Sequence, residues 1–159
     1  MIEIKVDSSG ALAKFSPAGI PEAVRRALRR VLPQLTIALG RKVDEKLGAL
    51  KSRTTLITTP QLVENPTAIY GRITVSAVSP SPSMLPSWLD TGTAPHVIAA
   101  RNAGALFFFW EKIGANAMFR QVHHPGFAGI QYRDAAINEM RDEIVSAISQ
   151  AVREGASVE

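Results

Sequence analysis

Three histidines are the residues whose type most directly suggests metal chemistry, because neutral imidazole is a common metal ligand. His123 and His124 are adjacent, and His96 is the third histidine, 27 positions before His123. Neighbouring side chains on an extended segment point to opposite faces, so His123 and His124 cannot easily share one ion. No carboxylate accompanies them at ligand spacing, and the chain has no cysteine. We therefore expect no metal site and no cofactor, and we expect hydrogen bonding around the turn at Pro125 and Gly126.

The segment Leu89-Asp90-Thr91-Gly92-Thr93 offers a second possible chemistry, because it resembles the Asp-Thr-Gly turn of retroviral-type aspartic proteases. Those enzymes bring two such carboxylates together, and the pair shares one proton and activates water. A homodimer would supply the second Asp90. Against this, Pro86 and Ser87 interrupt the place of the protease's buried strand. We favour a structural turn in which Asp90 and Thr91 bond turn amides and Gly92 adopts a positive φ. Contact with a neighbouring subunit is a third interpretation.

Other catalytic patterns are missing from the sequence. The serines form no Gly-x-Ser-x-Gly elbow, and no glycine-rich loop opens a helix as phosphate binding requires. Two long predicted helices also conflict with a mostly β protease fold. We therefore expect a protein that is not an enzyme.

Positive charge is concentrated in one segment. The chain carries a net charge of +4, and residues 20–53 hold nine lysines and arginines against three acids. Within that segment Arg25, Arg26, Arg29 and Arg30 lie opposite the apolar positions Ile20, Val24, Ala27 and Val31 of a helix, which predicts a basic outer face. Such a face is either solvated or in contact with an acidic partner. A small DNA-binding regulator is an alternative, but no stacking aromatics accompany these arginines, so we expect no specific nucleic-acid binding.

The periodicity of the apolar residues predicts an α+β fold, in which a small antiparallel or mixed sheet packs against a long N-terminal helix kinked at Pro33 and a C-terminal helix. The Gly/Pro/Ser-bearing segment Ser8–Gly19 is predicted to be a loop, and Ser79–Pro86 to be an exposed extended connection. The expected helices span residues 21–50 and 133–153. The expected strands include residues 2–7, Leu56 and Ile57 up to a stop at Pro60, 69–77, 97–98 and 105–110.

The size and composition are those of one domain spanning residues 1–159, because a chain of 159 residues buries enough surface for one sizeable core. The absence of cysteine excludes disulfides and thiolate metal sites. The sequence has no run of about 18 uncharged apolar residues and no signal-peptide pattern at its start. We therefore expect no membrane association and synthesis in the cytoplasm.

The aromatic run Phe107–Trp110 is first interpreted as core, the usual environment of large apolar side chains. Strand alternation places Phe107 and Phe109 opposite Phe108 and Trp110. One of these two pairs would then be covered only by a neighbouring subunit, which is how we expect a ring to be sealed.

The order of motifs from Trp88 to Phe127 resembles one family. W-L-D-T-G-T-A-P-H-x-I leads through A-L-F-F-F-W to V-H-H-P-G-F, and this order is similar to that of tailed-phage tail-completion proteins of the HK97 gp10-like and lambda gpZ-like group. The resemblance implies a virion structural protein, made in the bacterial host cytoplasm, that forms a commonly hexameric ring. That ring caps the tail tube and docks to the head connector.

The resemblance and the residue pattern together give a set of candidate contact residues. We expect subunit or tail-tube contacts from the Ser79–Thr93 segment, the Phe107–Trp110 strand and the His-Pro-Gly turn, and an acidic neighbour for the arginine face. The candidates at the assembly interface are Met84, Leu85, Trp88, Asp90, Thr91, Gly92, Thr93, Phe108, Trp110, His124, Pro125 and Gly126. The candidates for the acidic partner are Arg25, Arg26, Arg29 and Arg30.

Overall fold

A computed structural model describes residues 2–7, 20–53, 56–65, 68–78, 83–101 and 103–157. The predicted loop Ser8–Gly19 and residues 79–82 of the predicted 79–86 connection lie outside this range. Contacts divide the chain into two compact units, Met1–Pro86 with Gln131–Glu159, and Ser87–Ile130. No linker signal in the sequence pointed to this division. The α+β class is confirmed, with a long N-terminal helix, a C-terminal helix and small antiparallel sheets.

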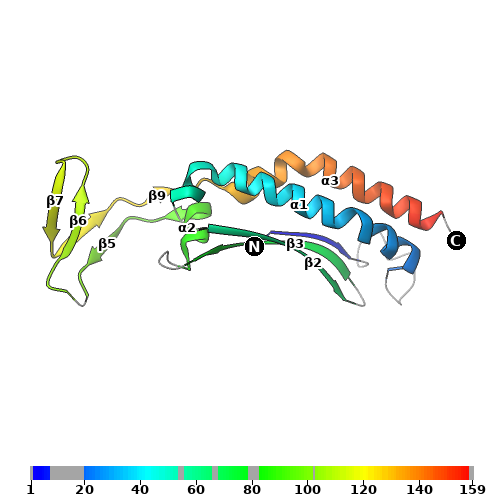
Figure 1. Cartoon of the computed structure of the whole chain (residues 1–159), viewed down its shortest axis with the longest axis horizontal. Coiled ribbons are helices and arrows are strands. Elements are labelled where there is room, and N and C mark those ends of the chain that lie inside the picture. The colour runs from blue at the N-terminus through cyan, green and yellow to red at the C-terminus, as the bar shows by residue number, and fades with distance from the viewer. Residues whose placement is uncertain are drawn as a thin grey trace. The chain divides into compact units, whose positions relative to one another are not determined.

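The first unit contains a three-stranded antiparallel sheet in the order β1-β3-β2 (Figure 1). Its strands are β1 (Ile2–Asp7), β2 (Leu56–Asn65) and β3 (Ala68–Ala77), and β2 pairs with β3 along its whole length, from Leu56 opposite Ala77 to Asn65 opposite Ala68. The predicted stop at Pro60 is wrong, because β2 continues through it. A proline is tolerated there because β2 is an edge strand, where one missing N–H need not break a ladder.

Helix α1 (Glu22–Arg53) runs through Pro33, and its departure from helical φ and ψ is at Gly48 instead. The helix therefore does not break at Pro33, and the kink expected there stays a prediction. An internal proline costs about 3 kcal/mol, but a single unbroken apolar stripe on both sides of Pro33 opposes a break. That stripe contains Leu28 and Leu32 rather than the predicted Ala27 and Val31, and all of its members are at most 5% exposed: Val24, Leu28, Leu32, Leu35, Leu39, Val43 and Leu47.

One face of the sheet packs against α1. Ile69, Gly71 and Ile73 of β3 are buried while the alternating Tyr70 and Arg72 are half-buried, which confirms the predicted inward and outward faces. Gly71 leaves room for Thr36, whose hydroxyl donates to the Leu32 carbonyl at 2.6 Å, satisfying a buried polar group within the helix. The open face of the sheet carries the Arg72 guanidinium over the Tyr70 ring.

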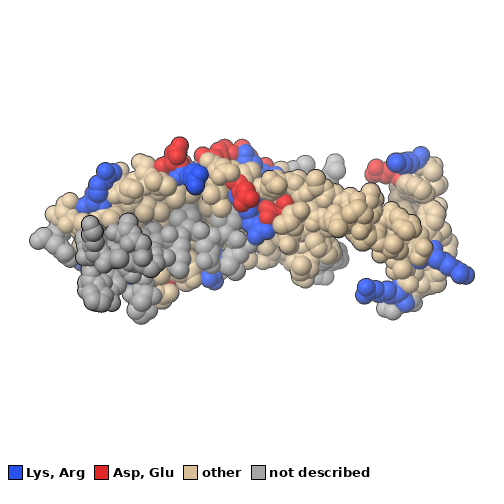
Figure 2. Space-filling model, turned by 180° about the vertical axis from the view of Figure 1, so that it is seen from behind, with Lys and Arg blue, Asp and Glu red and all other residues tan. Residues whose placement is uncertain are grey.

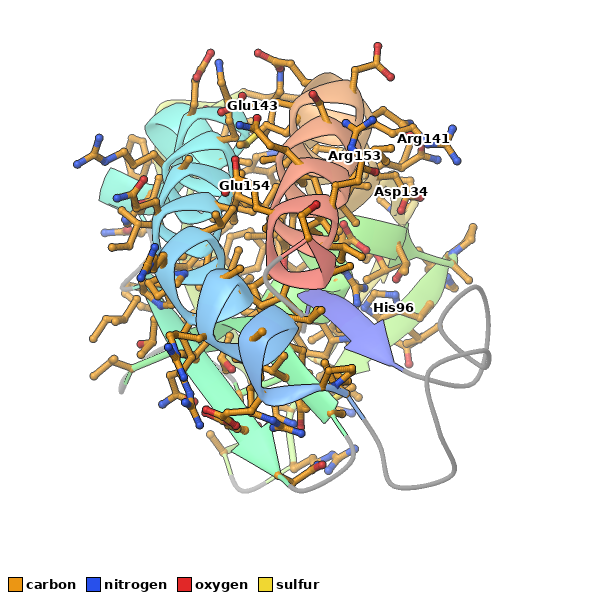
Figure 3. The ribbon with its side chains drawn as sticks, turned by 90° about the vertical axis from the view of Figure 1, so that its right-hand side faces the viewer. His96, Asp134, Arg141, Glu143, Arg153 and Glu154 are labelled. Carbon is orange, nitrogen blue, oxygen red and sulfur yellow. The ribbon has the colours of Figure 1, made fainter. Side chains whose placement is uncertain are left out.

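Helix α3 (Tyr132–Ala156) packs along α1 and extends the predicted 133–153 helix by a few residues (Figure 1). Its buried residues include Ala136, Met140 and Ala151, three members of the predicted stripe. Figure 3 shows Asp134 and Arg141 on the side of α3 directed away from α1. At its C-terminal end a Cβ on Gly155 would lie 2.5 Å from the Val24 Cα, so the backbones of the two helices touch there.

The predicted basic face is only partly correct, because two of its arginines are neutralised within the chain. Arg25 is 8% exposed, and its Nη1 donates to Glu64 Oε1 at 2.9 Å and to the Asn65 carbonyl at 3.0 Å. Arg29 forms a two-pronged pair with Glu64, at 3.0 and 2.8 Å, and a further contact with Glu22. The acidic partner of these two arginines is therefore Glu64, on β2.

Two acidic side chains remain ionised far below the usual range. The guanidinium of Arg29, and then that of Arg25, lowers the pKa of Glu64 from 4.5 to about 2. Lys42 and Lys46 of α1 likewise lower the pKa of Glu139 on α3 to about 2. One cluster thus links α1 to β2, and the other links α1 to α3.

Replacing Glu64 with Gln should lower the free energy of unfolding by about 1–2 kcal/mol at neutral pH, because Arg25 loses the carboxylate that it pairs with. This value lies between the usual cost of losing an exposed ion pair and that of losing a buried one. Since the pKa of Glu64 is lowered on folding, its contribution is complete above pH 4.5 and disappears as the pH falls toward 2. The free energy of unfolding of Glu64→Gln should therefore fall less than that of the wild type as the pH is lowered from 4.5 toward 2. Urea titrations over this range measure both effects. Glu22→Gln, at an exposed position, is the control and should cost under about 0.5 kcal/mol; equal losses in the two variants would contradict this account.

Replacing Gly155 with Ala should force α3 away from α1 and cost about 1–3 kcal/mol, the usual price of overpacking. Gly40→Ala is the matched change within α1, since its added Cβ would meet its nearest neighbours at 3.9 Å. That change should stabilise the protein by about 0.5–1 kcal/mol, because alanine is the better helix former. Thermal denaturation compares the two variants, and a neutral Gly155→Ala would show that the helices do not touch at this point.

Candidate assembly interface

The second unit is a two-stranded ribbon folded from the stretch that the motifs occupy (Figure 1). Three antiparallel pairs follow one another along it: β4 (Gly92–Thr93) with β9 (Phe127–Ala128), β5 (His96–Ala99) with β8 (Gln121–His124), and β6 (Leu106–Trp110) with β7 (Ala115–Phe119). The register is continuous from Gly92 opposite Ala128 to Ala99 opposite Gln121. It then shifts: six residues separate Ala99 from Leu106 on one strand, whereas Arg120 alone separates Phe119 from Gln121 on the other, and pairing resumes with Leu106 opposite Phe119.

The β4–β9 pair, which we call the base of the ribbon, brings together the two turns that the sequence predicted, at Gly92 and at Gly126. Gly92 has φ +83° and Gly126 has φ +76°, the left-handed region that favours glycine. A Cβ on Gly126 would overlap the Thr93 carbonyl oxygen, and a Cβ on Gly92 would overlap that of Phe127. The predicted positive φ of Gly92 is confirmed, and the W-L-D-T-G-T and H-P-G-F segments cross at backbone contact.

The chain before this crossing is helical, contrary to prediction. Helix α2 (Leu85–Thr91) includes the end of the predicted extended connection and places Asp90 and Thr91 in its last turn. The Thr91 hydroxyl donates to the Ser87 carbonyl at 2.9 Å, as in a helix, instead of bonding the turn amides as predicted. Asp90 is 8% exposed. Its local geometry therefore differs from that of a protease turn, which follows a strand.

The histidines contribute hydrogen bonds at the base, as predicted. The Gly126 amide donates to His124 Nδ1 at 3.0 Å, so that nitrogen carries no proton, and His96 Nδ1 donates to the Ala94 carbonyl at 2.9 Å. The two rings stack across the strand pair with centroids 5.0 Å apart. Within the part of the chain that the structure describes, no three His, Cys, Asp or Glu side chains form a group suited to a metal ion.

The Phe107–Trp110 strand is exposed on both faces of the second unit, so its interpretation as core is wrong. Phe107 and Phe109 are 67% and 60% exposed, whereas Phe108 and Trp110 are 37% and 39% exposed. Phe119 of the partner strand stacks against Phe108 and meets Trp110 edge-on, which accounts for the difference. The sequence analysis chose Phe108 and Trp110 as contact residues, but the other pair is the more exposed.

Several exposed apolar side chains were missed altogether. Met118 lies opposite Phe107 and is 68% exposed, and Ile113 in the tip turn is 57% exposed. The strand of Met118, A-N-A-M-F, contains too few large apolar residues to signal a strand by alternation. Other exposed members of the ribbon are Val97, Ile98 and Phe127, with Ile130 just beyond it.

Two hollows lie along the ribbon. The larger hollow has a volume of about 660 Å³, and both the β5–β8 pair and the β6–β7 pair contribute to its lining. The ribbon is therefore bent where the register shifts. The apolar part of the lining consists of Ile98, Leu106, Phe108, Trp110, Phe119 and Val122. Phe107, Gln121, His123, His124 and Pro125 also border it. The smaller, about 490 Å³, lies at the base, with Trp88, Thr93 and Phe127 among its lining residues. Among the described residues nothing hydrogen-bonds the buried Thr93 hydroxyl.

Charge is sparse on the ribbon, and most of its visible surface in Figure 2 is tan. Only five of the 44 residues from Ser87 to Ile130 are Asp, Glu, Lys or Arg. These are Asp90, Arg101, Glu111, Lys112 and Arg120. A surface of this kind binds apolar partners rather than a charged ligand.

The remaining candidates lie in the first unit. Met84 is 55% exposed, and Leu85 begins α2. Arg26 and Arg30 are exposed and border a small hollow of about 180 Å³ with Glu154 and Gly155. Arg29 is exposed as well, but its guanidinium is held by Glu64 and Glu22.

Comparison with family models, with curated proteins and with solved structures finds no match to this chain. Among the described helices none combines the length and the apolar character needed to cross a membrane.

Replacing Gly126 with Ala should open the base of the ribbon at a cost of about 2 kcal/mol or more, because the positive φ and the overlap with Thr93 both oppose a side chain. Gly114→Ala is the control, since Gly114 has φ +62° in the tip turn but a Cβ there meets nothing within 4 Å. It should cost only about 1 kcal/mol. Amide hydrogen exchange of residues 92–99 and 121–128 reports the opening, and unchanged protection in Gly126→Ala would rule out the crossing as a determinant of the ribbon.

Proposed function

We propose that this chain is a structural virion protein of a tailed phage that acts in tail completion or head-tail joining by assembling into a ring. The observation that carries the proposal is the ribbon, which exposes large apolar side chains on both of its faces. Its proposed partners are further copies of itself, a tail tube and a head connector. Its action is binding, with no bond made or broken.

The physical argument starts from the stability of such a ribbon. An isolated pair of strands is marginal in water, because it buries little apolar surface and leaves two free edges. Here Phe107, Phe109 and Met118 are all at least 60% exposed. Exposed apolar patches of this kind mark surfaces that another protein covers.

The sequence resemblance supplies the particular assembly. The motif pieces shared with tail-completion proteins occupy the crossing at the base of the ribbon and its aromatic strand. In the group that the chain resembles, such proteins form rings that are commonly hexameric. Contacts that are not self-complementary close into a ring when the rotation between subunits fits.

The geometry adds nothing in favour of the two alternatives. Asp90 lies in a helix rather than after a strand, and the other carboxylate of the ribbon, Glu111, lies in the turn between β6 and β7. Arg25 and Arg29, two of the four arginines invoked for DNA binding, hold Glu64.

The purified chain should form closed particles of one stoichiometry, because heterologous contacts close once the ring is complete. Native mass spectrometry gives the number of subunits, and negative-stain electron microscopy shows whether the particle is annular. Association should persist at high salt, since the surface that drives it carries few charges. A chain that stays monomeric at all concentrations, or phage particles that mature and infect normally without the gene, would refute the proposal.

A further inference from the structure

The two faces of the β6–β7 hairpin differ in shape. Side chains alternate along a strand, so Phe108 and Trp110 share one face, with Phe119 from the facing strand. This face forms one wall of the 660 Å³ hollow, and ring contacts at 5.9 and 5.5 Å hold its three aromatic side chains against one another. The concave side of the hairpin is therefore preformed.

The opposite face carries Phe107, Phe109 and Met118, which we call the knob. These side chains are 67%, 60% and 68% exposed, and Met118 lies directly opposite Phe107. Phe107 also borders the hollow, so it stands at the edge between the two faces. Each copy of the chain thus presents an apolar projection on one side of a hairpin and an apolar hollow on the other.

We propose that the knob of one copy seats in the hollow of the next copy, so that the ribbons join head to tail. The inference rests on the proposed ring assembly and names the surface through which that ring closes. Projection and hollow lie on opposite faces of one hairpin, so a copy that fills its neighbour's hollow leaves its own hollow free for a third copy. The contact is therefore heterologous and continues until the ring closes.

The apolar character of both surfaces selects a second copy as the occupant. A contact of this kind covers the knob and the hollow together, whereas an unrelated ligand in the hollow would leave the knob in water. With phenylalanine burying about 200 Å² when covered, the knob alone offers on the order of 350 Å². That is nearly half of the roughly 800 Å² that each partner contributes to a standard interface, and the free strand edges beside it can supply more.

Two variants test the contact by disabling one half each. Phe109→Asp places a charge on the knob, and Ile98→Asp places one in the hollow. Each variant alone should remain monomeric, because a charge does not enter an apolar contact. An equimolar mixture should form dimers and stop there, since each pair has one working knob and one working hollow. Val145→Asp, at a 58% exposed position of α3, is the control and should assemble like the wild type.

Each outcome of this mixing experiment decides something. Variants that assemble alone like the wild type, or a mixture that stays monomeric while the wild type forms rings, would overturn the knob contact and leave the ring in place. A wild type that never associates would overturn both. Circular dichroism of each variant shows whether it is folded.

Disulfide trapping provides an independent measurement, because the chain has no cysteine of its own. A chain with both Met118→Cys and Ile98→Cys should give, on oxidation, a ladder of linked subunits that ends at the ring size. The two single-cysteine chains are the controls and should give no linked product, since like positions do not meet in a head-to-tail contact. A ladder absent from particles that are rings by mass spectrometry would overturn the contact.

Discussion

The second unit depends on one close crossing of two backbone segments at Gly92, Gly126 and Gly129. A side chain at any of these positions would overlap the opposite backbone. The crossing joins segments that are more than thirty residues apart, and from it the strand register runs without interruption to Ala99 opposite Gln121. That register positions the inner ladder of β5 and β8, because a shift of one residue would exchange its two faces. The part of the larger hollow that β5 and β8 line thus depends on three small residues at the base.

The first unit has a separate basis, and the sequence predicted most of it. Alternation in residues 69–77 predicted the inner strand, and the periodicity after Pro21 predicted the long helix, because burial of one face imposes those patterns. The errors are local. Pro33 was expected to disturb the helix, yet α1 continues through it between buried leucines, and the non-helical backbone falls at Gly48. Arg25 was expected outside, and its burial reflects contacts with Glu64 and Asn65, which are distant in the sequence.

The candidate site was predictable in its parts but not in its arrangement. The two glycine turns are readable because positive φ and proline leave a clear signature. The pairing of those turns is not, since nothing local in residues 88–93 specifies residues 124–130 as their partner. The aromatic strand illustrates a different limit. A strand that is apolar on both faces fits a buried core and a surface awaiting a neighbour equally well. Only the position of Phe119 distinguishes Phe108 from Phe107.

The register shift midway along the ribbon has a consequence for how such a molecule changes over evolutionary time. Six residues separate the two ladders on one strand and one arginine separates them on the other, and within the described part of the longer side the Ala100 amide donates to the Arg120 carbonyl. Insertions and deletions are tolerated best where no strand pairing is lost. A change of length here would re-angle the outer hairpin while both ladders stayed intact. If the proposed ring forms, a change of length in this segment would alter the diameter of the ring without altering the first unit.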